Sequence, residues 1–382
     1  MWRLEGFDSA EFTREYWQKK PCVLRNAFPG FESPISPEEL AGLACEEDVH
    51  CRLVIEKDGA SPWQLRYGPF SDEDFLELPE THYSLLVSEC EKWLPELGDL
   101  LDQFRFIPNW RIDDLMISYA PQHGSVGPHV DEYDVFLLQA LGSRRWQYRD
   151  ERLEDPRLIP NLDLAILSEF DPDQDIVLNP GDMLYLPPGI AHHGVALERC
   201  MTYSIGFRAP DAVSTFESFA LELERLGGSV PRYRDPDLEL DRHNAEITDL
   251  EIARFRALTI ELFEQAPELW RDAVGKMLSD SAIGRETESE QPVFVSDLLA
   301  RDWIRHPETR MFYHLSSDNI QLYYNGHMHQ LPHTPEILEY LQQLCDQRDW
   351  PAALINRCID IEPLEKLLLE LASRSAILEI DE

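Results

Sequence analysis

Between residues 114 and 209 the chain is a succession of short apolar or alternating segments, among them LMISYAP, DVFLLQALG, RRWQYR and CMTYSIGFRAP. Gly, Pro and Asp separate these segments, which is the pattern of short β-strands joined by turns. A double-stranded β-helix, or cupin-type barrel, is the natural closure for such strands. The stretch therefore predicts a barrel that could carry a metal at one mouth.

Two segments of this stretch contain residue types that bind metals: GPHVDEYDVF, 127–136, and GDMLYLPPGIAHHGVAL, 181–197. In a His-x-Asp pair on a strand both side chains point to the same side, because strand side chains alternate with period two. Two imidazoles and one carboxylate can occupy one face of a non-haem Fe(II) and leave positions for a co-substrate and oxygen. We therefore predict that His129, Asp131 and His192 are metal ligands. His193 competes with His192, but the Pro-Pro-Gly-x-x-His spacing favours His192.

Composition limits the possible partners. The chain has 72 acidic and 34 basic residues, a formal net charge of −38. Such a surface would repel nucleic acid and attract a basic protein, although a need for solubility explains the charge equally well. Seven scattered cysteines without CxxC spacing are typical of reduced thiols in a cytosolic protein. We find no signal-peptide pattern and no run near the ~18 apolar residues of a membrane span, so we expect a cytoplasmic protein.

The segments outside the barrel are mostly helical in pattern. We expect a helix over 9–20 followed by a strand over 21–28, and helices over 73–103. After residue 209, helical spacing over 211–226 and 247–278 predicts a helical segment that caps the barrel or pairs between subunits. The polar run 279–291 reads as a linker.

A small α+β unit follows the linker, with a hairpin turned at Asn325-Gly326 between helical stretches, and this order suggests a winged helix. Acidic residues outnumber basic ones there, so DNA binding is disfavoured. His327, His329 and His333 lie on this hairpin and read as surface histidines, because no carboxylate or cysteine accompanies them in the sequence. We predict three domains: 1–209, 210–280 and 281–382.

Several of these segments resemble a known family. DDLMISYAP, VGPHVDEYDVFLLQ, GSRRWQ, NPGDMLYLPPGIAHHGVAL and MTYSIGFRAP are similar to segments of the bacterial JmjC/cupin-fold ribosomal oxygenases, and FTREYWQKKPCVLRNAF resembles their N-terminal part. The resemblance implies a protein hydroxylase that uses Fe(II), 2-oxoglutarate and dioxygen. It also implies a homodimer built by the helical segment, and, as substrate, a basic protein of the 50S ribosomal subunit hydroxylated at the β-carbon of an arginine. Beyond the metal ligands we expect no catalytic side chain.

The resemblance also suggests residue roles. Arg144 would anchor the distal carboxylate of 2-oxoglutarate through its guanidinium fork, with Arg145 as its rival on the same strand. Ser118 and Tyr119 would line that pocket, with Thr202 and Ser204 as weaker candidates, and Ala120 stands where relatives often carry a serine. A substrate arginine could meet acidic and aromatic residues near the mouth, unless these are merely solvated: Asp113, Asp114, Glu132, Tyr133 and Asp134.

Three alternatives stay open at this point. A histidine hydroxylase or lysine demethylase of the same superfamily would keep all of these features. A cupin isomerase or dioxygenase without a keto-acid would keep the three ligands but would not need Arg144. A non-enzymatic ribosome-assembly or regulatory protein could tolerate the loss of a ligand, whereas all three are present here.

Overall fold

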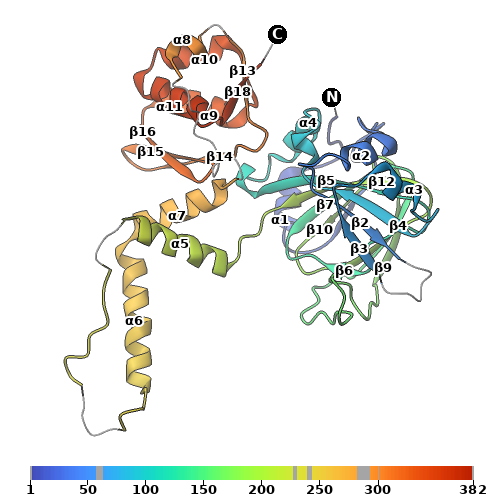
Figure 1. Ribbon diagram of the computed structural model, residues 1–382, viewed down its shortest axis with the longest axis horizontal. Coiled ribbons are helices and arrows are strands. Elements are labelled where there is room, and N and C mark those ends of the chain that lie inside the picture. Colours follow the sequence, from blue (N-terminus) through green and yellow to red (C-terminus); the bar gives the residue numbers. More distant parts are fainter. Residues whose placement is uncertain are drawn as a thin grey trace. The chain divides into compact units, whose positions relative to one another are not determined.

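The computed structural model describes residues 2–56, 63–226, 230–238, 243–281, 293–299 and 301–380. The chain divides into two compact units, Met1–Ala209 and Pro210–Glu382, and Figure 1 shows their secondary structure. The division falls where the sequence pattern changes from strands to helices. Within the described ranges, no helix combines the length and the apolar character that crossing a membrane requires.

The first unit is built on two antiparallel sheets. One has the order β1-β10-β7-β12-β5-β4-β2-β3 and the other the order β6-β11-β8-β9. The strands are β1 Cys22–Leu24, β2 Cys51–Ile55, β3 Gln64–Tyr67, β4 Tyr83–Val87, β5 Ile112–Ala120, β6 His129–Val130, β7 Asp134–Leu141, β8 Arg144–Tyr148, β9 Gln174–Leu178, β10 Met183–Leu186, β11 Ala191–Ala196 and β12 Cys200–Phe207. Short helices accompany them: α1 Ser9–Glu15, α2 Pro37–Leu43, α3 Asp72–Leu76 and α4 Leu97–Leu101, with the 3₁₀ turns η1 Cys90–Lys92, η2 Asp102–Phe104 and η3 Asn109–Arg111.

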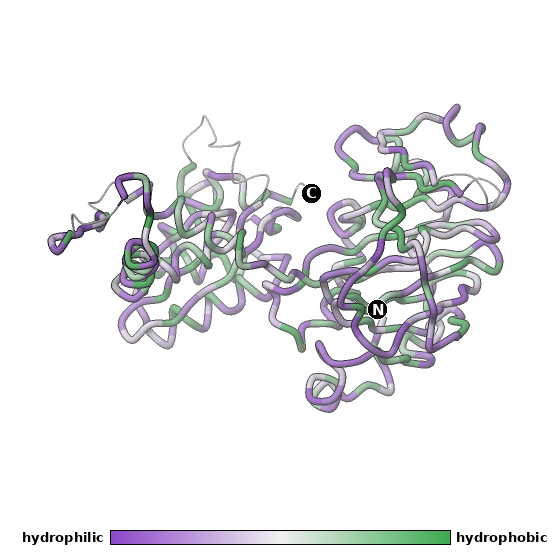
Figure 2. The backbone as a smooth tube through the Cα atoms, turned by 90° about the horizontal axis from the view of Figure 1, so that it is seen from below, coloured by the Kyte–Doolittle hydropathy of each residue, from purple (hydrophilic) through white to green (hydrophobic). Residues whose placement is uncertain are grey.

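Aromatic side chains fill the core beneath the larger sheet. Phe104, Phe136 and Phe207 are fully buried, and their rings pack against one another at centroid distances of 5.0–6.4 Å. Every residue of β12 is buried because this strand lies in the middle of the sheet, between β5 and β7. In Figure 2 hydrophobic stretches run along the strands of this unit and hydrophilic ones dominate its outer loops. Burial of these rings therefore contributes to the stability of the first unit.

The prediction of helices over 73–103 is wrong in its central part. The α-helices of this range are only the short α3 and α4 at its ends, and YSLLV forms strand β4 between them, followed by the 3₁₀ turn η1. This strand pairs with β5 on one side and β2 on the other, and its residues Leu85, Leu86 and Val87 are buried. Sheet pairing thus overrides the helical pattern of the local sequence. The strands β2, β3 and β4, which the sequence analysis did not predict, extend the barrel sheet.

The second unit begins with three helices, α5 Ala212–Leu226, α6 Asp249–Gln265 and α7 Pro267–Ser279. The predicted helix over 247–278 is two helices, because the backbone leaves the helical region at Ala266 and Pro267 starts a new helix. Helix α5 packs on α7 through Phe219, Leu269 and Ala273. The predicted linker, 279–291, lies mostly outside the described residues.

The remainder of the second unit has two small sheets, β14-β15-β16 and β17-β13-β18. The hairpin predicted at Asn325-Gly326 is confirmed, and both turn residues have positive φ angles. The elements are α8 Val295–Leu298, β13 Trp303–Arg305, β14 Met311–Leu315, β15 Asn319–Tyr324, β16 His327–Pro332, α9 Pro335–Asp346, β17 Asp349–Trp350, α10 Ala352–Ile359, α11 Glu362–Ser373 and β18 Ile377–Glu379. Leucines of α9 and α11 enclose its core around Trp350.

Candidate active site

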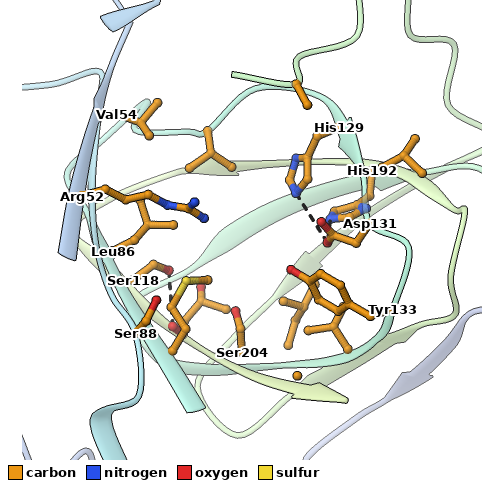
Figure 3. Close-up of a pocket in the computed structure, with 18 of the residues that line it drawn as sticks. Arg52, Val54, Leu86, Ser88, Ser118, His129, Asp131, Tyr133, His192 and Ser204 are labelled. Atoms are coloured by element: carbon orange, nitrogen blue, oxygen red, sulfur yellow. Dashed lines mark hydrogen bonds and ion pairs between the residues drawn. The ribbon is translucent and has the colours of Figure 1, made fainter. Parts of the chain in front are cut away.

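The structure brings His129, Asp131 and His192 together at one mouth of the barrel (Figure 3). His129 opens β6 and pairs directly across the sheet with His192 of β11. Their Nε2 atoms lie 3.7 Å and 3.5 Å from the Oδ2 atom of Asp131. One nitrogen or oxygen atom of each residue lies within 4.8 Å of the other two. Three such atoms facing a common point form a set that could hold a metal ion.

The backbone fixes how the two imidazoles face this point. The Nδ1 atom of His129 lies 2.9 Å from the carbonyl oxygen of Gly127, and that of His192 lies 2.9 Å from the carbonyl oxygen of Ile190. A carbonyl only accepts hydrogen bonds, so each Nδ1 carries the proton and each Nε2 presents its lone pair to the cluster. Burial, and after it the neighbouring His129, lowers the pKa of His192 to about 4. His192 is therefore neutral at neutral pH, as a metal ligand must be.

Two glycines give the ligand-bearing loops their shape. Gly127 and Gly189 have φ angles of +82° and +83°, which side chains with a Cβ rarely adopt. The carbonyl of Gly127 holds His129, as described above. The amide of Gly189 donates a 2.7 Å hydrogen bond to the carbonyl of Asp131. The Gly-Pro-His and Pro-Pro-Gly segments therefore position the three candidate ligands as well as turning the chain.

His193 points away from the cluster. Its Nε2 atom lies 3.0 Å from the hydroxyl of Ser125, and its ring meets the edge of Phe170. Burial, and after it the charge of Arg144, lowers the pKa of His193 to about 4. His193 is thus a neutral packing residue on the other face of β11, where strand alternation places it.

A cavity of about 360 Å³ extends from the triad into the barrel, and Arg144 of β8 lies in its wall. Arg144 is only 3% exposed, and its guanidinium stacks over Trp146 at 5.1 Å and donates a 3.1 Å hydrogen bond to the carbonyl of Gly194. A Cβ atom at position 194 would lie 2.6 Å from Arg144 Nε, so a glycine is required there. Arg145 faces outward and donates a 2.8 Å hydrogen bond to Asp175.

Arg144 is a buried charge that lacks a counter-ion. Burial lowers the pKa of its guanidinium, its Nε atom has no hydrogen-bond partner, and within the described part of the chain it forms no ion pair. An unpaired buried charge is costly, and a guanidinium fork matches a carboxylate in both charge and shape. The residues present therefore fit a small carboxylate ligand bound between Arg144 and the triad.

Hydroxyl groups also line this cavity. Ser118, Thr202 and Ser204 all contribute to its wall. The Thr202 hydroxyl donates its one proton to Gln139, at 3.1 Å, so it offers only lone pairs to a ligand. The Ser118 hydroxyl makes a long 3.3 Å bond to the Thr202 carbonyl and could redirect its proton towards a carboxylate. Ala120 packs with Ala196 and Cys200, and it supplies no hydroxyl group.

The candidate substrate residues lie in different places in the structure. Asp114 and Tyr133 line the cavity near its mouth. Burial raises the pKa of the Tyr133 phenol, and the charges of Asp131 and Asp114 raise it further, so its hydroxyl stays protonated. Glu132 lies on the surface, 3.2 Å from Arg152, and Asp113 forms a 2.8 Å ion pair with Arg208.

The prediction that Asp134 faces the mouth of the barrel is wrong. Its side chain is fully buried and does not line the cavity. It accepts hydrogen bonds from Tyr185 at 2.5 Å, Arg111 at 2.9 Å and Gln18 at 2.9 Å. These three donors occupy its carboxylate, so Asp134 is a structural residue that ties the N-terminal segment to the barrel.

One wall of the cavity is formed by residues that were not predicted from the sequence. Arg52 and Val54 of β2, Leu86 of β4 and Ser88, which directly follows β4, form this wall (Figure 3). These residues belong to segments that were read as helix or left unassigned, and they carry no motif. A correct prediction of β2 and β4 as added barrel strands would have placed them by alternation alone.

Comparisons with known proteins match residues 99–215 to the JmjC domain. The uL16 3-hydroxylase of Escherichia coli is 42% identical over 290 residues, 75% of each chain. A probable ribosomal oxygenase of Haemophilus influenzae is 42% identical over 230 residues, 60% of this chain and 54% of the other. The structure of YcfD, a ribosomal oxygenase from E. coli, in complex with cobalt and 2-oxoglutarate superposes with a TM-score of 0.83 at 34% identity, and covers all of both chains.

These similarities confirm the predicted JmjC/cupin fold and the resemblance on which it rested. The match extends beyond the barrel to the whole chain, and it includes a relative whose structure holds both a metal ion and the keto-acid. The chain therefore belongs to the JmjC-domain ribosomal oxygenases, the family that includes the uL16 3-hydroxylase of E. coli.

Proposed function

We propose that this protein is an Fe(II)- and 2-oxoglutarate-dependent hydroxylase that acts on the β-carbon of an arginine in a large-subunit ribosomal protein. One observation carries the proposal. Three unblocked ligand atoms converge beside a cavity whose inner wall holds a buried, unpaired guanidinium. The keto-acid needs both features, a metal and a counter-charge for its far carboxylate. The kinship with the uL16 3-hydroxylase supplies the substrate class.

His129, Asp131 and His192 would hold the iron. Bound iron would supply the oxidative chemistry: 2-oxoglutarate and dioxygen would give succinate and carbon dioxide, with one oxygen atom in the succinate and the other inserted into a substrate C–H bond as C–OH. No side chain needs to take up or release a proton on the substrate. The contribution of the protein is positioning: backbone carbonyls orient both imidazoles, and the barrel wall restricts water.

Arg144 would pair with the distal carboxylate of the keto-acid. Its depth in the cavity and its stacking on Trp146 hold the guanidinium in one orientation before the ligand arrives. Ser118 would add a hydroxyl donor, and Thr202 would complete the wall, with its own proton committed to Gln139.

Asp114 and Tyr133 would receive the guanidinium of the substrate arginine. Both lie at the mouth, where a carboxylate can pair with the guanidinium and a phenol can hydrogen-bond to it or stack on it. Glu132 would contribute to the negative field of the rim without entering the cavity. The net charge of −38 supports a basic partner, because the field attracts cations, and it disfavours binding to free DNA.

We further propose that the chain forms a homodimer through the helical segment and functions in the cytoplasm, where it meets ribosomal proteins. Large apolar side chains are exposed along α5 and α6, among them Val213 at 67%, Phe216 at 51% and Ile252 at 58%. Such exposure is expected where a second subunit covers the surface. The helices and the β14-β15-β16 sheet that follow would form the winged-helix-like domain. Light scattering that shows only a 44.3 kDa species at micromolar concentration would contradict the dimer.

The direct test of the proposed activity uses purified protein with Fe(II), 2-oxoglutarate and a uL16 peptide. We expect the peptide to stimulate succinate formation and to gain one oxygen atom on an arginine. Oxygen on a histidine, or loss of a methyl group from a lysine, would instead indicate one of the activities named for another relative. That relative is a bifunctional lysine-specific demethylase and histidyl-hydroxylase of Drosophila pseudoobscura, which is 27% identical over 194 residues. No turnover with any of them would favour a non-enzymatic role.

A further inference from the structure

Arg52 lies on a cavity wall that the JmjC match does not include. The match begins at residue 99, whereas Arg52 belongs to β2, which joins the barrel sheet through β4. Along β2, Cys51 and Leu53 face the core, so alternation turns Arg52 and Val54 towards the cavity. Figure 3 shows the Arg52 guanidinium pointing into the pocket, towards the side that holds the metal triad.

Arg52 differs from the other arginines around this mouth. Arg152 and Arg208 are paired with the carboxylates of Glu132 and Asp113. Arg52 is exposed, and in the described ranges its guanidinium has neither an ion-pair nor a hydrogen-bond partner. Five N–H donors are therefore available at the mouth of a pocket in a strongly acidic protein.

The nature of the proposed reaction limits what Arg52 can bind. A guanidinium cannot pair with the guanidinium of the substrate, which the negative charge of Asp114 draws to its own side of the mouth. The β-carbon, however, is one bond from the main chain. When that carbon lies near the metal, the adjacent peptide carbonyls must lie within a few ångströms of it. Carbonyl oxygens are acceptors, and they are the part of a basic peptide that a free guanidinium can hold.

Resting on the proposed function, we propose that Arg52 is a substrate-binding residue that donates hydrogen bonds to the main-chain carbonyl oxygens beside the target arginine. Arg52 and Asp114 would then hold the two ends of one residue, its main chain and its guanidinium. Fixing both ends determines which carbon of the side chain lies nearest the metal. Arg52 would therefore determine the hydroxylated position as well as the affinity for the peptide.

The test compares the wild type with Arg52→Met and Arg52→Lys, using Arg66→Met as the matched control. Arg66 lies on the neighbouring strand β3 and pairs with Asp74, outside the cavity lining. Fluorescence anisotropy with metal-free protein measures binding of a labelled uL16 peptide, and fragmentation mass spectrometry and NMR locate the added oxygen. For Arg52→Met we expect about tenfold weaker peptide binding, the loss of one charge-assisted hydrogen bond, and oxygen spread to other side-chain carbons. Arg52→Lys should restore part of the affinity, and Arg66→Met should match the wild type.

Two altered peptides identify the acceptor. The first has an ester in place of the peptide bond after the arginine, which weakens that carbonyl as an acceptor. It should bind the wild type less well but should cause no further loss in Arg52→Met, because the two changes remove the same interaction. The second has its acidic side chains converted to amides, and it should leave the effect of Arg52→Met intact. If that effect disappears instead, Arg52 binds a side-chain carboxylate and the carbonyl assignment is overturned.

Wild-type affinity and an unchanged oxygen position in Arg52→Met would also overturn the proposal. So would a defect confined to the KM for 2-oxoglutarate, which would place Arg52 in the co-substrate site. The binding measurement keeps this test separate from the proposed activity. Wild-type protein that binds the peptide without oxidising it would refute the proposed activity. The comparison of peptide affinities would still show whether Arg52 contributes to binding.

Discussion

Each of the two units of the molecule has two histidines with a carboxylate nearby, and the two groups behave differently. In the first unit, His129 and His192 give their Nδ1 protons to backbone carbonyls, and their Nε2 atoms face Asp131. In the second, His329 donates through Nδ1 to Glu370 at 2.6 Å, and the Tyr324 hydroxyl donates to the same carboxylate at 2.5 Å.

The difference lies in which atoms are already satisfied. Arg374 also approaches Glu370, at 3.6 Å, so that carboxylate is surrounded by donors of its own unit. His327 lies 3.4 Å from Arg374, and His333 bonds to the carbonyl of Ser316. Among the described residues, the triad of the first unit is the one group found that could hold a metal. A metal site therefore requires lone pairs left unused by the protein, and residue types and spacing alone do not show this.

The largest effect should follow from removing a triad ligand. His129→Ala or Asp131→Ala should reduce Fe(II)-dependent succinate formation to the level of a metal-free control, because two ligands hold iron weakly. His329→Ala, the matched change in the second unit, should retain turnover. Wild-type turnover in His129→Ala, or equal losses in His129→Ala and His329→Ala, would remove the distinction between the two groups. Circular dichroism of each variant checks that the fold is intact.

The next largest effect concerns the buried charge. Arg144→Ala should raise the KM for 2-oxoglutarate by a factor that corresponds to about 2–3 kcal/mol, because the carboxylate would lose its charge-assisted partner. Arg145→Ala removes a neighbouring guanidinium that pairs with Asp175 at the surface, so its KM should stay near that of the wild type. Steady-state kinetics with varied 2-oxoglutarate measure both. The reverse result, a defect in Arg145→Ala alone, would mean that the outward arginine binds the keto-acid.

A smaller loss of turnover is expected at the second of the two adjacent histidines of β11. His192→Ala removes a ligand and should abolish turnover. His193→Ala removes only a contact with Ser125 and a ring packed on Phe170, and we expect less than a tenfold loss. Turnover numbers with saturating iron provide the comparison. Complete loss in both variants would show that His193 has a role in the chemistry that its position on the outer face does not explain.

The triad could be proposed from the sequence because the His-x-Asp alternation and the Pro-Pro-Gly-x-x-His spacing are local properties, whereas Arg144 was suggested by the family resemblance. Asp134 could not be placed, because its burial depends on Gln18, Arg111 and Tyr185, which come from three distant segments. Arg52 was missed for a similar reason: β2 and β4 become barrel strands only by pairing with β5 and each other. The second histidine group was read as surface residues since its partner, Glu370, lies on α11, outside the hairpin.

The smallest predicted effect tests the network of the second unit. His329 holds the pKa of Glu370 at about 2, and Tyr324 contributes. A folded-state pKa below the usual ~4.3 of a glutamate gives stability that is present above that value and lost as the pH falls towards 2. Glu370→Gln should therefore destabilise the unit by about 1–2 kcal/mol at pH 7, since the carboxylate is partly exposed, and by less at pH 3.

Hydrogen exchange of α11 peptides in increasing urea measures this difference. A destabilisation that stays constant between pH 7 and pH 3 would show that Glu370 acts through packing and not through its charge.

The central claim is that the triad of this chain puts oxygen on an arginine of a ribosomal protein. Its most direct test is mass spectrometry of uL16 from cells that carry either the wild-type gene or the His129→Ala variant. We predict one additional oxygen atom on one uL16 arginine in the wild type and an unmodified arginine in the variant. An unmodified arginine in both strains, or the same oxidised arginine in both, would contradict the claim.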